Sequence, residues 1–466
     1  MKNRNEGARP FGFRDKIGYL FGDFGNDFTF ILSTMLLLKF YTDVVGVSGG
    51  VVGTVMMIAR FLDGFTDIAM GRICDRSAVR KSGKFKPWIL RMCVPVALSS
   101  FLIYQDFLAS WPLFARILWL FVTYVLWSSV FYTSINIPYG SMASAISSDG
   151  GDRQSLSTFR TLGGTLAGLI IGVSLPLFVY EQRGDQVVLN GRNATVLAAV
   201  FSVFAVVCHL LCYKLVQERV SVDPDSKVCQ QPLSATLKNA IRNKPLISII
   251  FASVFMLLAQ LTMQNMAAYI YPDFYGTAAA QSVSTVVMMG TMILSAVLAK
   301  PLTSRFGKAE VSAFSNLFAA IICIVTYFLR PSSVWVYVAL QGICWLGLGI
   351  FSMVSWAVIT DVIDDSELKY GVREDGSVYA LYSFARKLGQ ALAAGASGWL
   401  LDFVGYENGV SGGQSDSVLQ GIFNISTLVP AIGFFALALI LYFWYPLHKK
   451  QVESNALAMK KRHKRG

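Results

Sequence analysis

The chain has 466 residues, of which 54% are hydrophobic and only 15% are charged, and its formal net charge is +12. This composition excludes an ordinary soluble globular protein, in which about 25% of residues are charged. The excess of lysine and arginine does not indicate nucleic-acid binding, because it is spread over separate loops and tails. The composition therefore predicts a membrane protein.

Twelve continuous apolar runs follow one another along the chain. Each is at least as long as the roughly 20 residues that a helix needs to cross the hydrocarbon core. Continuous runs indicate helices, because the strands of a membrane barrel alternate between apolar and polar residues. We therefore predict an all-α membrane protein with twelve transmembrane helices. They are expected at 17–42, 51–74, 87–108, 113–146, 155–180, 193–216, 246–271, 281–303, 308–329, 333–361, 377–404 and 419–446.

A polar stretch between the sixth and seventh runs divides the chain into two halves. We predict an N-terminal six-helix bundle at 1–216, a central loop at 217–245, a C-terminal six-helix bundle at 246–446 and a basic tail at 447–466. Lysine and arginine concentrate in both tails, in the central loop and in the loop after the second run. The positive-inside rule then places both termini in the cytoplasm of a multi-pass protein of the cell (inner or plasma) membrane.

Carboxylates lie inside two of the predicted spans. Asp63 and Asp67 are four residues apart in the second span, and Asp23 and Asp27 have the same spacing in the first. This spacing places each pair on one helical face. A charge at the bilayer centre costs at least ~2.5–3.5 kcal/mol, so acids inside the membrane indicate a functional site. Paired carboxylates suit Na⁺ or Li⁺, and they can also hold a proton.

Polar partners for these acids occur in later spans. Tyr132, Thr133 and Asn136 lie in the fourth span, Arg160 in the fifth and Lys387 in the eleventh. Sugar hydroxyl groups bind carboxylates and cationic side chains through charge-assisted hydrogen bonds, and a tyrosine ring can stack on a sugar ring. The combination predicts an ion-coupled transporter with a sugar-like substrate.

A further group of charges ends the tenth span. Asp361, Asp364 and Glu367 lie there, and Arg373 follows. We predict that they form a cytoplasmic gate with basic loops that include Arg305. An ordinary solvated helix end is the alternative, because a surface ion pair contributes only ~0–1 kcal/mol.

Five motifs, in this order along the chain, resemble the signatures of the glycoside–pentoside–hexuronide:cation symporters. This family of the major facilitator superfamily includes the melibiose permease and the glucuronide carrier. The likeness extends from about residue 16 to about residue 449. The motifs are Phe40-Tyr-Thr-Asp43-Val-Val-Gly46, Ala59-Arg60-Phe-Leu-Asp63-Gly-Phe-Thr-Asp67, Gly83-Lys-Phe-Lys-Pro-Trp88, Asn136-Ile-Pro-Tyr-Gly-Ser141 and Gly371-Val-Arg373-Glu-Asp-Gly376.

The resemblance implies two sets of site residues. Asp63, Asp67 and Thr133 match the family's cation ligands, and Thr66 stands where the melibiose permease has asparagine, which leaves Na⁺ and H⁺ open. Asp27, Arg160 and Lys387 match residues of its sugar site. The predicted substrate-binding set is Asp23, Asn26, Asp27, Tyr132, Asn136, Arg160, Tyr382, Ser383 and Lys387.

The chemical class of the sugar has two alternatives. Asp27 would repel a carboxylate, which favours a neutral glycoside or oligosaccharide. Asn136 stands where the melibiose permease has an acid, and at this position the chain resembles the glucuronide carrier instead. Gly140 replaces that permease's sugar-stacking tryptophan. With Arg160 and Lys387 retained, the site would then admit a hexuronide.

We therefore predict a secondary active transporter, not an enzyme, which couples Na⁺ or H⁺ to symport of a glycoside, oligosaccharide or hexuronide by alternating access. No cofactor is expected besides the coupling ion. The expected partners are the sugar, the cation and the bilayer, with no nucleic acid, and the protein is expected to act as a monomer. One alternative is a cation-coupled lysolipid symporter, which the charges Asp27, Arg160 and Lys387 disfavour. Another is a non-transporting sugar sensor, for which the roughly twenty residues after Tyr445 are too few to form a signalling domain.

Overall fold

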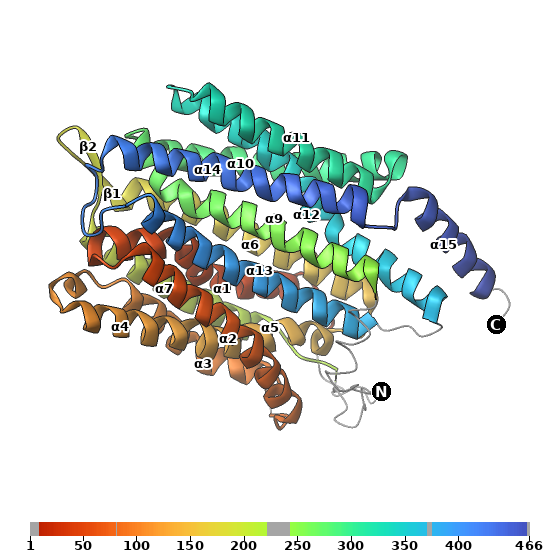
Figure 1. Ribbon diagram of the computed structural model, residues 1–466. Helices are drawn as coiled ribbons and strands as arrows, with labels where there is room; N and C mark the ends of the chain where they lie inside the picture. Colours follow the sequence, from red (N-terminus) through yellow and green to blue (C-terminus); the bar gives the residue numbers. More distant parts are fainter. Residues whose placement is uncertain (1–8, 81, 221–242, 371–374, 464–466) are drawn as a thin grey trace. The chain divides into compact units, whose positions relative to one another are not determined.

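Helices account for nearly all of the described chain, as the continuous apolar runs predict (Figure 1). The computed structural model describes residues 9–80, 82–220, 243–370 and 375–463. The first half contains α1 (Phe13–Phe40), α2 (Gly49–Arg76), α3 (Lys86–Ile103), α4 (Leu113–Val125), α5 (Thr133–Ile146), α6 (Gly150–Val179) and α7 (Gly191–Leu215). The second half contains α9 (Lys244–Tyr269), α10 (Ala279–Phe306), α11 (Lys308–Leu329), α12 (Val334–Tyr370), α13 (Asp375–Phe403), α14 (Asp416–Leu439) and α15 (Lys449–His463).

Short irregular elements interrupt or join these helices. A 3₁₀ turn, η2 (Asp106–Ser110), precedes α4, and an antiparallel hairpin of β1 (Tyr180–Arg183) and β2 (Gln186–Leu189) joins α6 to α7. Within the described residues, π-helical turns extend or join helices at four places, and such turns are rare and often mark functional sites. They are η1 (Tyr41–Val45), η3 (Leu126–Tyr132), η4 (Ile270–Phe274) and η5 (Ile440–Trp444).

Ten helical segments of the described chain are long and apolar enough to cross a membrane. The set includes the continuous segment Leu113–Ile146, in which η3 joins α4 to α5. The helices α2 and α13 are not in this set, although they have 28 and 29 residues, because both carry several charged side chains. Every predicted span nevertheless coincides with a helix, so the predicted all-α membrane fold is confirmed.

The chain packs as two units. The first consists of Met1–Lys227 together with Gly276–Ser282 and Ser397–Ser415, and the second consists of Val228–Tyr275, Val283–Ala396 and Asp416–Gly466. Two short segments from the second half of the sequence thus belong to the first unit. The division into bundles at 1–216 and 246–446 stays a prediction.

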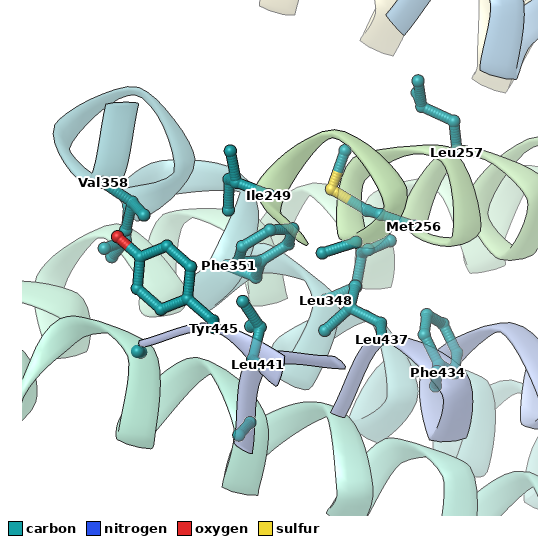
Figure 2. Close-up of a cluster of buried hydrophobic side chains, with 14 of the residues drawn as sticks. Ile249, Met256, Leu257, Leu348, Phe351, Val358, Phe434, Leu437, Leu441 and Tyr445 are labelled. Atoms are coloured by element: carbon teal, nitrogen blue, oxygen red, sulfur yellow. The ribbon is translucent and has the colours of Figure 1, made fainter. Parts of the chain in front are cut away.

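Apolar side chains from α9, α10, α11, α12, α13, α14 and η5 form the core of the second unit. Figure 2 shows part of this core, in which the ring of Phe351 lies among aliphatic side chains. In a bilayer, close packing stabilises such contacts more than the exclusion of water does. The labelled residues are Ile249, Met256, Leu257, Leu348, Phe351, Val358, Phe434, Leu437, Leu441 and Tyr445.

In the first unit, the segment after α7 holds the start of α3. The Glu218 carboxylate accepts hydrogen bonds from the backbone N–H groups of Lys84, Phe85 and Lys86 at 2.7, 3.0 and 2.8 Å. A helix leaves its first N–H groups without partners, and a negative charge there also suits the helix dipole. Gly83 has a φ of +118°, and a Cβ at this position would collide with the Glu218 carboxylate. The glycine of the Gly83–Trp88 motif is therefore required for both conformation and space.

We expect Glu218→Ala to lower the free energy of unfolding by about 2–3 kcal/mol, because three N–H groups lose a charged acceptor. Glu218→Gln keeps one carbonyl oxygen and should lose less. The unfolding temperature of the purified protein in detergent measures both. Glu453→Ala is the matched control, because the Glu453 side chain is 63% exposed. An unfolding temperature of Glu218→Ala equal to that of the control would contradict this account.

A buried ion pair lies where α1 continues into η1. Lys39 Nζ lies 2.8 Å from Asp43 Oδ2, and both side chains have 0% exposure. Lys39 also donates to the Tyr406 hydroxyl at 2.8 Å, and that hydroxyl donates to Asp43 Oδ1 at 2.8 Å. Tyr406 belongs to Ser397–Ser415, so this network ties that segment to the end of α1.

Further hydrogen bonds join the same segment to the first unit. The backbone N–H of Gly409 donates to the Thr42 carbonyl at 2.7 Å, and the indole N–H of Trp399 donates to the Thr54 hydroxyl at 3.0 Å. The Ser411 hydroxyl accepts from the backbone N–H of Leu189 in β2 at 2.6 Å. The segment is thus attached to α1, α2 and the hairpin.

Candidate functional site

Asp23 and Asp27 of α1 lie against α6. Arg160 donates through Nε to Asp23 Oδ1 at 2.9 Å. The guanidinium carbon also lies 5.2 Å from the centroid of the Tyr139 ring, and 39% of the Arg160 side chain remains exposed. Asp27 makes no hydrogen bond or ion pair with another described residue, so its carboxylate keeps its capacity to accept hydrogen bonds.

Two glycines allow α6 to bring Arg160 to these acids. A Cβ on Gly163 would lie 2.5 Å from the backbone carbonyl oxygen of Leu20, so the two helices approach closely here. A Cβ on Gly164 would lie 2.5 Å from Asp27 Oδ2 and 3.0 Å from Asp23 Oδ2. The space occupied by the two carboxylates therefore exists because residue 164 has no side chain.

The polar residues of the fourth span complete this side of α1. Asn26, which is 2% exposed, donates through Nδ2 to Asn136 Oδ1 at 3.4 Å. The ring of Tyr132 is stacked on Phe30 with centroids 5.6 Å apart, and it also lies 5.7 Å from the Trp127 ring. The structure thus brings Asn26 and Asn136 together and packs Tyr132 against two aromatic side chains.

The acids of α2 face η3 and the start of α5. Asp63 is 6% exposed and accepts hydrogen bonds from the Ser128 hydroxyl at 2.6 Å and from the Ser129 hydroxyl at 2.6 Å. Asp67 Oδ1 accepts from the Thr133 hydroxyl at 3.0 Å. Each acid therefore has hydroxyl groups of the fourth span beside it. Thr66 differs from Thr133, because its hydroxyl donates to backbone carbonyls of its own helix at 3.3 Å.

Arg60 lies between the two sets of residues. Its Nη1 is 3.5 Å from Asp63 Oδ2. Its guanidinium carbon lies 4.7 Å from the centroid of the Phe30 ring and 6.0 Å from that of Trp127. Because Phe30 stacks on Tyr132, a continuous chain of contacts runs from Asp63 to the side of α1 that carries Asp27.

The remaining predicted substrate residues lie on α13 in the second unit. The Tyr382 hydroxyl accepts from Ser253 at 2.8 Å, and its ring packs edge-on against Trp356 at 5.0 Å. Tyr382 is fully buried, whereas Ser383 is exposed and Lys387 is half-buried. Their role in substrate binding stays a prediction.

The described residues of the predicted gate belong to the second unit and differ in what they contact. Asp361 pairs with Lys308 at 2.7 Å, a residue that is not among the predicted gate residues. Arg305 lies 5.2 Å from the centroid of the Phe306 ring. Asp364 and Glu367 are half-buried on α12, and Arg373 lies outside the described residues. The gate therefore stays a prediction.

Sequence reasoning missed Ser128 and Ser129. For Ser129, the distance of four residues from Thr133 was a usable signal, because residues at i and i+4 share a helical face. Ser128 is five residues from Thr133, and no such spacing rule places it beside Asp63; it lies there in the π-helical turn. Arg60 appears in a quoted motif, but its two aromatic neighbours, Phe30 and Trp127, come from other helices. Its position between them follows only from the packing.

Solved structures with this fold are membrane transporters. A bacterial homologue of the human lysosomal transporter Spinster matches 97% of this chain and 98% of its own with a TM-score of 0.67 and 12% identity. A D-xylose–proton symporter matches 93% of this chain and 97% of its own with a TM-score of 0.62 and 13% identity. The chain thus shares the fold of these two proteins. Residues 18–449 match the model of the MFS/sugar transport proteins, and the chain belongs to this family.

Curated relatives cover nearly the whole chain. An uncharacterized symporter, YjmB, of Bacillus subtilis is 30% identical over 96% of this chain and 95% of its own. A glucuronide carrier protein homolog of Escherichia coli is 27% identical over 97% and 96%. A putative sulfoquinovose importer of Escherichia coli is 30% identical over 97% and 94%. The predicted superfamily is confirmed, and so is the prediction that the protein is a transporter and not an enzyme.

Proposed function

We propose that the protein couples the movement of a sugar or sugar acid across the membrane to Na⁺ or H⁺ by alternating access. The observation that carries this proposal is the pairing of two acid sets within the first unit. Asp27 lies beside the Asp23–Arg160 pair, and Asp63 and Asp67 lie against the hydroxyl groups of the fourth span. The contacts of Arg60 and Phe30 join the two sets.

Asp27, together with the Asp23–Arg160 pair, suits a polyhydroxylated ligand. A carboxylate accepts two sugar hydroxyl groups, and a guanidinium donates to others in a fixed planar geometry. Asp27 has its acceptors available, and Arg160 is held in place by Asp23 while remaining partly exposed. Arg160 is therefore already oriented before the ligand arrives, which lowers the entropic cost of binding.

Two observations point to different charges on the sugar. Asp23 neutralises Arg160 at 2.9 Å, so Asp27 leaves this part of the site negative and favours a neutral glycoside. Two of the relatives are named for a glucuronide and for sulfoquinovose, both of which are acidic sugars. Uptake of neutral glycosides compared with uptake of glucuronides separates these alternatives.

Coupling follows from linkage between the two sets. A cation that binds at Asp63 and Asp67 changes the electrostatic environment of Arg60, which contacts the aromatic side chains next to the sugar set. If the cation raises sugar affinity, the sugar must raise cation affinity by the same factor. We also propose that both termini lie in the cytoplasm, since the basic residues concentrate in the tails and central loop. The transporter is further proposed to act as a monomer.

Uptake into proteoliposomes tests the proposal. Radiolabelled neutral glycosides and glucuronides are offered under an inward Na⁺ gradient at fixed pH, and separately under an inward proton gradient. We expect one of the two gradients to accelerate uptake of one of the two classes. Absence of gradient-driven uptake for every sugar, in a preparation that stays folded, would contradict cation-coupled symport.

We expect Gly164→Ala to raise the KM of the transported sugar about tenfold, which corresponds to ~1.4 kcal/mol. The new methyl group would displace the Asp27 and Asp23 carboxylates from their positions. Gly71→Ala in α2 is the matched control, because a Cβ at Gly71 meets nothing within 4 Å. The measurement is the initial uptake rate as a function of sugar concentration. Equal KM values for the two variants would show that the sugar does not depend on these carboxylates.

A further inference from the structure

Two consecutive serines of η3 hydrogen-bond to one carboxylate. Ser128 lies 2.8 Å from Asp63 Oδ1 and 2.6 Å from Oδ2, and Ser129 lies 2.6 Å from Oδ1. Consecutive residues of a regular α-helix point about 100° apart, so they do not normally face the same group. The wider π-helical turn brings both hydroxyl groups to Asp63.

Ser128 also joins the two acids of α2. Its backbone carbonyl accepts a hydrogen bond from the Thr133 hydroxyl at 3.3 Å, and the same hydroxyl lies 3.0 Å from Asp67 Oδ1. A connected set of oxygens therefore extends from Asp63 through Ser128 and Thr133 to Asp67. These oxygens come from α2 on one side and from η3 and α5 on the other.

The hydroxyl of Ser129 has a second acceptor. Its oxygen lies 3.2 Å from the backbone carbonyl oxygen of Ala59, in addition to Asp63. A hydroxyl group has one hydrogen and two lone pairs. When a cation neutralises the carboxylate, the Ser129 hydrogen can turn to Ala59 and leave the lone pairs directed at the cation. Ser129 can therefore change from a donor to Asp63 into a ligand without moving its oxygen.

We propose that Ser128 and Ser129 complete, with Asp63, a binding site for a small alkali-metal cation, Na⁺ or Li⁺. Hard cations of this kind prefer oxygen ligands, and the hydroxyl groups add neutral oxygens to the carboxylate. This inference rests on the proposed cation coupling and names the two residues that determine the affinity for the metal. Ser128 and Ser129 act beside Asp67 and Thr133 and do not replace them.

Cation binding to the purified full-length protein, without sugar, tests the inference. The readouts are the rise in unfolding temperature with added NaCl or LiCl against choline chloride, and the tryptophan fluorescence of the protein, since buried Trp127 adjoins Ser128. We expect Ser128→Ala and Ser129→Ala each to raise the dissociation constants for Na⁺ and Li⁺ by about 10–100-fold. Ser129→Thr, which keeps the hydroxyl, should restore much of the affinity.

Ser99→Ala in α3 is the matched control. Ser99 is 5% exposed, and its hydroxyl donates to backbone carbonyls of its own helix at 2.9 and 3.0 Å. Unchanged affinity in both alanine variants, with clear Na⁺ or Li⁺ binding by the unmodified protein, would overturn the inference and leave cation-coupled symport intact. Absence of any Na⁺ or Li⁺ response in the unmodified protein would overturn it as well. Sugar uptake under a proton gradient would then test the proposed function separately.

Discussion

Asp63→Asn is expected to abolish the stimulation of sugar uptake by a cation gradient and to reduce the initial rate at least about 100-fold, or ~2.7 kcal/mol. The Asp63 carboxylate accepts from two serine hydroxyl groups and lies beside the Arg60 guanidinium. Asparagine cannot provide the negative charge that a cation requires. The measurement is the initial uptake rate in proteoliposomes with and without the gradient.

Asp75→Asn is the control for this variant. Asp75 lies at the end of the same helix and is exposed, so its neutralisation should leave the stimulation unchanged. Asp67→Asn should reproduce the loss seen with Asp63→Asn. Full stimulation in both α2 variants would place the coupling cation elsewhere in the protein.

Single substitutions in the Lys39–Asp43 pair are expected to destabilise the protein by about 3–5 kcal/mol, because each leaves a buried charge without its partner. Both side chains have 0% exposure, so water cannot replace the lost partner. Tyr406→Phe removes a hydroxyl group but no charge, and should lose only about 1–3 kcal/mol. Unfolding temperatures in detergent measure all three variants.

The double variant Lys39→Met, Asp43→Leu gives the decisive comparison. Replacing both members of a buried pair with apolar residues is often close to neutral. We therefore expect it to be more stable than either Lys39→Met or Asp43→Leu alone. If the two single losses simply add in the double variant, the side chains do not interact in the way that the 2.8 Å contact indicates.

The membrane fold could be predicted because apolar length is a local property of the chain. Each predicted span coincides with a helix, and the fourth span at 113–146 coincides with the continuous segment Leu113–Ile146. The π-helical turns could not be predicted in this way. In η3 the turn depends on what its side chains meet on α2, and that contact is not encoded in apolar periodicity.

The candidate site was predictable as a set of residues but not as a set of contacts. The i, i+4 spacing indicated that Asp63 and Asp67 share a face, and they do face the same span. It could not show that Arg160 pairs with Asp23 and not with Asp27, because that choice depends on how α6 is rotated about its axis. Sequence spacing within one helix says nothing about this rotation.

The partners of buried charged residues near helix ends could not be predicted from the sequence either. Lys39 lies near the end of its span, where a lysine normally extends towards the membrane surface. Its partners Asp43 and Tyr406 instead enclose it, and Tyr406 is 367 residues away in the sequence. Glu218 similarly follows α7 yet caps α3. Long-range pairing of this kind requires the tertiary structure.

The membership of Ser397–Ser415 in the first unit bears on whether the two halves can fold autonomously. A fragment ending in the central loop would contain Lys39 and Asp43 but would lack Tyr406, together with the backbone donor of Gly409. In such a fragment, the Lys39–Asp43 ion pair at the end of the first helix would lack the hydrogen bonds that the Tyr406 hydroxyl makes to both members. Complementation between separately produced halves should therefore depend on early association, with the C-terminal fragment acting in part as a folding partner for the N-terminal one.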